Sequence, residues 1–373
     1  MARARQIYLD WNATTPPADS VLAAMEAARS HAWANPSSVH SAGRAARRLI
    51  EDTRERLAAL LELHARDVVL TGGGTEANNL ALAQAPGLAL SRLEHPSVVR
   101  VAEALAAAGR PVVWLPVSRQ GQIEVEAVPE LCRDLPGGSW LAAMFVNHET
   151  GVVQPLEKLA IAAHALGLKV HTDAVQALGK LDLGPLIHAD SISVAAHKLR
   201  GPKGVGALCL RADQQGVVPV PRPVLRGGSQ ERGFRPGTQD ALAMAGFGAA
   251  LERLSKHRAD LEGVRALRDR LETALVGWGE VSGAGAPRAP HVSNLRFRGW
   301  RGDELVAALD LEGICVSAGS ACSAGTLEPS PVLAAMLDPD AAVRGVRFSL
   351  GEDTASEDIE RVIQVLKQLV GSD

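Results

Sequence analysis

The sequence predicts an α/β protein built around a mostly parallel sheet, with a smaller α+β unit towards its C-terminal end. Three observations indicate this. Short apolar runs alternate with helical patterns through the first two-thirds of the chain, polar or glycine-rich clusters follow several runs, and a Gly/Ala/Pro-rich break at 283–290 interrupts the pattern. Alternating strands and helices are typical of parallel sheets. We expect a large domain over 15–255 and a small domain formed by 1–14 and 256–373.

The composition argues against several classes of protein. The chain has 373 residues, and 39 basic against 42 acidic side chains leave a net charge of −3, which favours neither nucleic acid nor an anionic membrane as partner. No apolar run approaches the ~18 residues that span a bilayer, and no apolar segment of a signal peptide follows the N-terminal charges. Four cysteines without CxxC spacing suggest neither disulfides nor a metal site, so we expect a cytoplasmic protein.

The first clear strand, at 68–71, leads into a glycine-rich turn and then a helix-compatible segment. Gly72, Gly73, Gly74 and Thr75 stand at this junction, where exposed N–H groups at the positive end of a helix dipole can bind a phosphate. The turn matches neither the Walker pattern nor Gly-x-Gly-x-x-Gly. An ordinary flexible turn therefore remains open as an alternative.

Further strands end in polar residues. Helical patterns at 97–109 and 155–166 separate these strands. The runs at 88–92, 140–146 and 168–172 are followed by His95, by the polar segment 147–151 and by Asp173. Ligand sites in open parallel sheets gather at the carboxyl ends of strands, although a lone histidine is usually structural and an Asp there can simply form a turn.

Lys198 follows another strand of buried type, and a Gly/Pro turn at 201–206 separates it from the strand at 207–210. A lysine held in this way can be desolvated, which favours the nucleophilic amine; a lysine that caps the strand and points to water is the alternative. Together with the phosphate seat and Asp173, it suits a cofactor that has a phosphate, a ring nitrogen and an aldehyde. That description fits pyridoxal phosphate.

The last third of the chain predicts a domain-connecting helix within 239–276 and then the small unit. We expect strands at 292–298, 314–317 and 345–350, and helices near 303–311, 331–337 and 356–370. The run 317–326 consists of small residues around Cys322, which suits a mobile arm that carries a thiol; a linker with an inert thiol is the alternative.

The chain resembles the cysteine desulfurases of the NifS/IscS type, which are class V aminotransferase-like, fold-type I pyridoxal phosphate enzymes. The resemblance covers nearly the whole chain and is carried by the segments 8–15, 35–38, 74–76, 94–95, 147–151, 171–176, 197–198, 226–233, 237–238, 317–322, 327–330 and 346–351. It implies conversion of L-cysteine to L-alanine, with the sulfur held as a persulfide on Cys322. An acceptor protein for iron–sulfur cluster assembly or for thiolation of tRNA or cofactors would then receive the sulfur.

The resemblance implies roles around the cofactor ring. Lys198 would join the aldehyde, Asp173 would pair with the pyridine nitrogen, and Gln176 would hydrogen-bond the phenolic oxygen. His95 would stack on the ring and act as acid and base. Arg347 would hold the substrate carboxylate, a task that suits its planar guanidinium.

The resemblance also implies where the phosphate binds and which residues surround the substrate. The matching positions are Gly74, Thr75 and His197 for the phosphate, Thr238 for a contact from a second subunit, and Asn35 for the substrate pocket. A homodimer is thereby implied. Selenocysteine lyase or a related lyase, for which the loop thiol is dispensable, and a non-catalytic paralogue that binds partners are the alternatives.

Two positions depart from the family pattern. His148 stands where the family usually has Asn; its imidazole could still donate to the ring oxygen or the substrate carboxylate, with a charge that depends on pH. Ala195 stands where a serine usually donates to the phosphate. The loss of one such hydrogen bond costs about 1–2 kcal/mol, which the remaining donors could tolerate.

Overall fold

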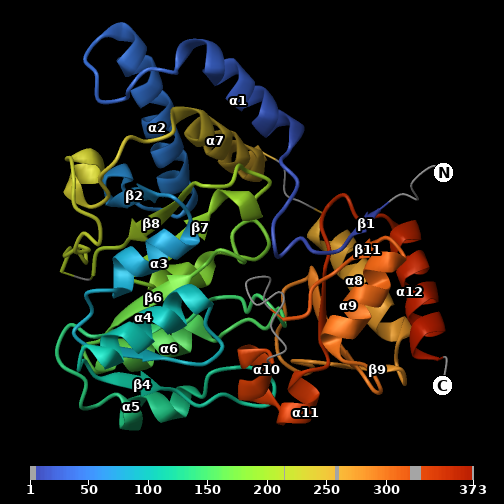
Figure 1. The fold of residues 1–373 in the computed structure, drawn as a ribbon. Helices are drawn as coiled ribbons and strands as arrows, with labels where there is room; N and C mark the ends of the chain where they lie inside the picture. Colours follow the sequence, from blue (N-terminus) through green and yellow to red (C-terminus); the bar gives the residue numbers. More distant parts are fainter. Residues whose placement is uncertain (1–5, 214, 257–259, 320–328, 372–373) are drawn as a thin grey trace.

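A central sheet with the strand order β2-β8-β7-β6-β5-β3-β4 organises the larger part of the protein (Figure 1). This computed structural model describes residues 6–213, 215–256, 260–319 and 329–371. The strands are β2 (Val68–Thr71), β3 (Leu88–Leu90), β4 (Val112–Trp114), β5 (Trp140–Ala142), β6 (Lys169–Asp173), β7 (Ser191–Ala195) and β8 (Gly206–Leu210). From β7 to β4 neighbouring strands are parallel, while β8 is antiparallel to β7 and β2. The mostly parallel sheet is thus confirmed.

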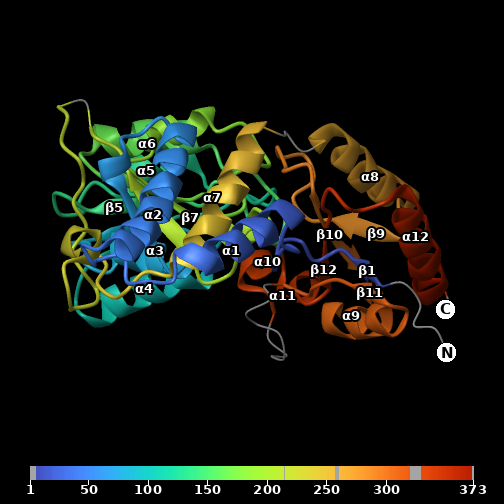
Figure 2. The ribbon, with the colours of Figure 1, turned by 90° about the horizontal axis from the view of Figure 1, so that it is seen from above.

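Helices cover both faces of this sheet, because side chains of each strand alternate between the two faces. Val68 and Leu70 belong to the apolar cluster that includes α2, α6 and α7, whereas Val69 packs with Ala77 of α3. Seen from above, α3 and α4 lie on one side and α6 on the other (Figure 2). The helices are α1 (Asp19–His31), α2 (Ser41–Leu60), α3 (Gly74–Leu82), α4 (Pro96–Ala107), α5 (Val128–Leu131), α6 (Leu156–Ala165) and α7 (Ala241–Lys256).

The C-terminal unit has its own sheet and its own apolar core. Its strand β10 lies between β12 and β9, and the N-terminal β1 pairs with β11. Phe297, Phe348 and Leu366 are fully buried in the core of this unit, which Leu9 joins. The elements are β1 (Ile7–Tyr8), α8 (Leu261–Ala274), β9 (Gly279–Val281), β10 (Val292–Phe297), α9 (Gly302–Leu311), β11 (Ile314–Cys315), α10 (Pro331–Met336), α11 (Pro339–Ala342), β12 (Gly345–Ser349) and α12 (Ser356–Val370).

The helical pattern at 239–276 forms two helices rather than one connecting helix. The helix α7 ends at Lys256, and α8 starts after Asp260, whose carboxylate accepts a hydrogen bond from the backbone N–H of Gly263. An Asp at this position caps a new helix, so the prediction of a single helix was wrong. The predicted domain boundaries remain a prediction.

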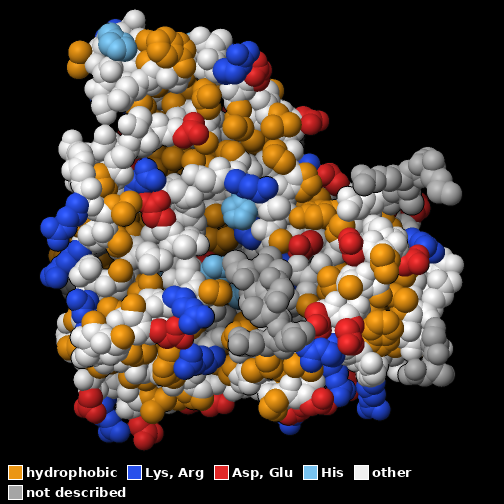
Figure 3. All heavy atoms as spheres, viewed as in Figure 1, with side chains coloured by type: hydrophobic (Ala, Val, Ile, Leu, Met, Phe, Trp, Pro, Cys, Tyr) orange, Lys and Arg blue, Asp and Glu red, His pale blue; other side chains and the backbone are white. Residues whose placement is uncertain are grey.

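The surface carries both signs of charge. On the face shown in Figure 3, basic and acidic side chains lie interspersed, in keeping with the net charge of −3. Among the described residues, no helix combines the length and the apolar character that crossing a membrane requires.

Candidate active site

A cavity of about 220 Å³ lies at the carboxyl ends of β6 and β7 and reaches β12 of the C-terminal unit. It brings together most of the predicted site residues: Gly74, Thr75, His95, His148, Asp173, Gln176, His197, Lys198 and Arg347. Asn35 and Thr238 are exposed, and neither lines this cavity. Cys322 belongs to the segment 320–328, which is outside the described residues.

Lys198 is held by the N-terminal segment of the chain. It ends a 3-10 turn, Ala196–Lys198, that directly follows β7. Its Nζ donates to the carbonyl oxygen of Ala13 at 2.8 Å and to that of Asn12. The amine is therefore hydrogen-bonded to the backbone of residues 12–13 at the wall of the cavity. The alternative, in which Lys198 caps the strand and points to water, is wrong.

Asp173, the last residue of β6, is buried and held by hydrogen bonds to both carboxylate oxygens. Its Oδ2 accepts from Asn78 Nδ2 at 2.8 Å, and its Oδ1 accepts from the backbone N–H of Val175 at 3.0 Å. His171 Nε2 lies 3.0 Å from Asn78 Oδ1, so its donation there fixes the orientation of the Asn78 amide. The carboxylate is consequently fixed at the edge of the cavity.

His95 caps the N-terminus of α4 and is neutral at ordinary pH. Its Nδ1 lies 3.1 Å from the backbone N–H of Ser97 and 2.7 Å from Ser97 Oγ. Burial, followed by the nearby His148, lowers the pKa of His95 to about 4, although Asp173 acts in the opposite direction. When Nδ1 accepts from the backbone, the neutral ring carries its proton on Nε2.

Arg347 and His148 are neighbours at the wall of the cavity and retain unused hydrogen-bonding capacity. Arg347 is buried in β12; it donates to Asp10 Oδ1 at 2.5 Å and to the backbone oxygen of His148 at 3.1 Å. Within the described residues its Nε has no hydrogen-bond partner. The same holds for both ring nitrogens of His148, although Nε2 lies 3.6 Å from Glu149 Oε1. Buried nitrogens of this kind suit a polar ligand.

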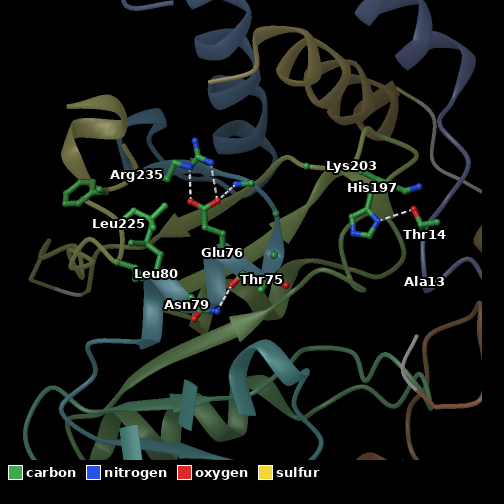
Figure 4. Close-up of a pocket in the computed structure, with 16 residues that line it drawn as sticks. Ala13, Thr14, Thr75, Glu76, Asn79, Leu80, His197, Lys203, Leu225 and Arg235 are labelled. Atoms are coloured by element: carbon green, nitrogen blue, oxygen red, sulfur yellow. Dashed lines mark hydrogen bonds and ion pairs between the residues drawn. The ribbon is translucent and has the colours of Figure 1, made fainter. Parts of the chain in front are cut away.

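The N-terminus of α3 opens into both this cavity and a neighbouring one of about 720 Å³ (Figure 4). The first hydrogen bond within the helix runs from the N–H of Ala77 to the carbonyl oxygen of Gly73. The N–H groups that precede Ala77 in the first turn have no acceptor within the helix and can therefore bind a ligand. His197 Nδ1 lies 3.1 Å from Thr14 Oγ1, and burial lowers the pKa of His197 to about 4. Ala195 lines the cavity with a methyl group, which offers no donor to a ligand.

These residues fit pyridoxal phosphate. A buried carboxylate, an amine and an open helix N-terminus surround one cavity, and the unpaired nitrogens of His148 lie beside them. They match the pyridine nitrogen, the aldehyde, the phosphate and a further oxygen of that cofactor.

Several functional side chains were missed by sequence reasoning. Asn12, Asn78 and Ser97 all line the cavity, and Asp10 pairs with Arg347. For Asn78 a signal was present, because a buried polar side chain within an apolar helical segment needs a partner. Asn12 offered none, since its contacts come from residues far along the chain.

Comparisons with known proteins agree with the resemblance seen in the sequence. Residues 7–362 match the family model described as aminotransferase class-V. Cysteine desulfurase 2 of Trichormus variabilis is 38% identical over 98% of this chain and 93% of its own length. The cysteine desulfurase NifS of Azotobacter vinelandii is also 38% identical, over 98% and 92%.

Solved structures agree as well. A NifS-like protein from Rickettsia africae superimposes with a TM-score of 0.86 at 27% identity, over 98% of this chain and 99% of its own. The structure described as SspA in complex with cysteine has a TM-score of 0.79 at 30% identity, over 94% and 100%. The chain therefore belongs to the aminotransferase class-V family of pyridoxal phosphate enzymes, and within it to the group of NifS-type cysteine desulfurases.

Proposed function

We propose that this protein is a pyridoxal phosphate-dependent cysteine desulfurase that converts L-cysteine to L-alanine and passes the sulfur on as a persulfide. The observation that supports this most strongly is the meeting of Lys198, Asp173 and Arg347 at one cavity. The names of the relatives aligned over 98% of the chain point to the same reaction.

The cofactor, when bound, supplies an electron sink for the substrate carbon. Lys198 would hold its aldehyde, and the Asp173 carboxylate would pair with its ring nitrogen. The N–H groups of Gly74 and Thr75, together with His197, would bind the phosphate. Because Asp173 is already held by Asn78 and Val175, it would need no rearrangement to do so.

Arg347 and His148 would bind the substrate. The guanidinium has an unpartnered Nε, which can donate to the carboxylate of L-cysteine while Asp10 holds the other end of the group. His148 can add a hydrogen bond from either ring nitrogen. Asn35 is exposed and does not line this cavity, so its contact with the substrate stays a prediction.

His95 would exchange protons at Nε2. With Nδ1 accepting from the Ser97 N–H, the neutral ring carries a proton on Nε2 that it can donate. Accepting a proton there requires the other tautomer, in which Nδ1 gives up this bond and donates to Ser97 Oγ, 2.7 Å away. The Ser97 hydroxyl, which also accepts from Asn78, would thereby let the neutral ring act as a base.

The sulfur step would use Cys322. Its thiolate would bond to the sulfur of the substrate while the carbon–sulfur bond breaks, and a proton would then take the place of sulfur on the carbon, giving alanine. The persulfide would pass to an acceptor protein, for iron–sulfur cluster assembly or for thiolation of tRNA or cofactors. A cytoplasmic location stays a prediction.

A homodimer would complete the phosphate site. Thr238 is exposed, and so are Val224 and Leu225, which line the larger cavity beside the N-terminus of α3. Exposed apolar side chains next to a polar site suit an interface with a second copy. Sedimentation of the purified protein should give the mass of a dimer.

The substitution Cys322→Ala tests the function. The variant should keep the visible absorbance of the bound cofactor yet lose sulfide release from L-cysteine. Unchanged turnover would contradict the persulfide step and favour the lyase alternative, which a comparison of L-cysteine with L-selenocysteine would then resolve.

A further inference from the structure

Lys180 lies one helical turn after Gln176, in a stretch that sequence reasoning assigned no role. The backbone of 174–181 forms a helical turn, with Leu178 N bonding Ala174 O and Leu181 N bonding Ala177 O. Residues four apart on such a turn share one face. Accordingly, Lys180 Nζ donates to Gln176 Oε1 at 2.9 Å.

The Gln176 carboxamide is consequently held at both ends. Its Nε2 donates to the carbonyl oxygen of Asn12 at 2.9 Å, while its Oε1 accepts from Lys180. If the amide were flipped, its oxygen would lie against the carbonyl oxygen of Asn12 and its NH₂ group against the amine of Lys180. Both contacts would be repulsive, so the two partners fix the orientation of the amide. Gln176 is buried and lines the cofactor cavity, so its second Nε2–H remains available to a ligand there.

The surroundings of Lys180 are cationic rather than acidic. Burial, followed by the charges of Lys198 and Arg347, lowers the pKa of Lys180 to about 7. Lys180 in turn helps to lower the pKa values of His197 and His291. It shares a small cavity with Glu352, but that carboxylate pairs with Arg200 at 2.7 Å and with Arg253. An apolar side chain would cost less in this place.

We propose that Lys180 is a positioning residue for the cofactor, which orients the Gln176 carboxamide so that Nε2–H meets the phenolic oxygen and which, in its protonated form, places a positive charge behind that oxygen. The inference rests on the proposed function, since it requires pyridoxal phosphate in the cavity. It gives a role to a half-buried amine that the reaction itself does not use.

The test compares Lys180→Met, which removes the donor and the charge, with Lys180→Arg, which keeps both. In the loaded Met variant the pH midpoint of the visible cofactor band should rise by about half a unit, because loss of a nearby positive charge favours the protonated chromophore. Its dissociation constant for pyridoxal phosphate should rise about tenfold.

The Arg variant should have a pH midpoint and a dissociation constant near those of wild type. Lys169→Met, which alters a half-buried lysine at the start of β6 that stacks on Trp140, is the matched control and should change neither quantity.

A double-substitution cycle separates positioning from a merely structural role. In a Gln176→Leu background, Lys180→Met should weaken cofactor binding much less than in wild type, because the partner through which it acts is gone. Without cofactor, the Met variant should melt at or above the wild-type temperature, because a half-buried amine in cationic surroundings has been removed. An unchanged midpoint, an equal loss of binding in both backgrounds, or a lower melting temperature would each overturn the proposal. If wild type itself bound no pyridoxal phosphate, the proposed function would fail instead.

Discussion

The two sides of the active-site cavity differ in how completely their polar groups are paired. On the side of the central sheet, Asp173, Asn78 and His171 hydrogen-bond one another in sequence. On the side of β12, Arg347 and His148 keep nitrogens without hydrogen-bond partners among the described residues. A fully paired network is rigid and suits a resident cofactor, whereas unused donors suit a substrate that enters and leaves.

The largest effect is expected from Asp173→Asn on the paired side. An amide nitrogen there would oppose either the N–H of Val175 or that of Asn78, and the negative partner of the ring nitrogen would be lost. We expect kcat to fall about 10²- to 10³-fold, with the visible cofactor spectrum altered.

A matched control for Asp173→Asn is Asp190→Asn. Asp190 also accepts from a backbone N–H, that of Val170, but does not line the cavity. This control should lose stability but keep the cofactor spectrum. Equal kinetic losses in both variants would mean that the Asp173 network acts only on folding.

Arg347→Lys probes the unpaired side. Lysine has one nitrogen where the guanidinium has three, and this single point cannot reach Asp10, His148 O and the substrate together. KM for L-cysteine should therefore rise about 30-fold, equivalent to ~2 kcal/mol. Cofactor affinity should change little. Arg54→Lys, at a buried arginine paired with Glu231 away from the cavity, should leave KM unaltered. A loss of cofactor in Arg347→Lys would erase the distinction between the two sides.

A smaller effect is expected for Ser97→Ala, which removes the hydroxyl between His95 and Asn78. The loss of a hydrogen bond of ~1 kcal/mol should lower kcat about fivefold without a change in KM. Ser191→Ala removes a hydroxyl 2.8 Å from another buried histidine, His171, and serves as control. If the two variants slowed turnover equally, the proton role of His95 would lose its support.

The smallest effect concerns stability against pH. Burial lowers the pKa of His171 to about 4 from the ordinary 6.5. The unfolded chain therefore binds more protons between these values, and the free energy of unfolding should fall as the pH drops through this window. Urea unfolding at pH 7, 6 and 5 should show a slope that His171→Asn reduces by up to about 1.4 kcal/mol per pH unit. An unaltered slope would contradict a buried neutral His171.

The paired side was also the easier side to predict from the sequence. Asp173 ends one buried strand, Lys198 comes three residues after another, and Gly74 begins a helix after a third, so the sheet alone brings them to one edge. The mostly parallel fold followed from the same alternation of strands and helices.

The contacts between distant segments could not be predicted in this way. Lys198 binds a carbonyl of Asn12 across 186 residues, and Arg347 pairs with Asp10 across 337. No local pattern encodes such pairs, since tertiary packing alone brings them together. The start of a second helix after Asp260 could have been found, because an Asp followed by Leu-Glu-Gly is compatible with a helix cap.

The most direct test of the central claim is the amount of L-alanine that the protein loaded with pyridoxal phosphate forms from L-cysteine, measured for wild type and for Lys198→Ala. The account predicts catalytic formation of alanine by wild type and a loss of about 10³-fold or more in the variant, because the amine that would hold the cofactor is gone. Equal alanine formation by both proteins, or none by loaded wild type, would contradict it.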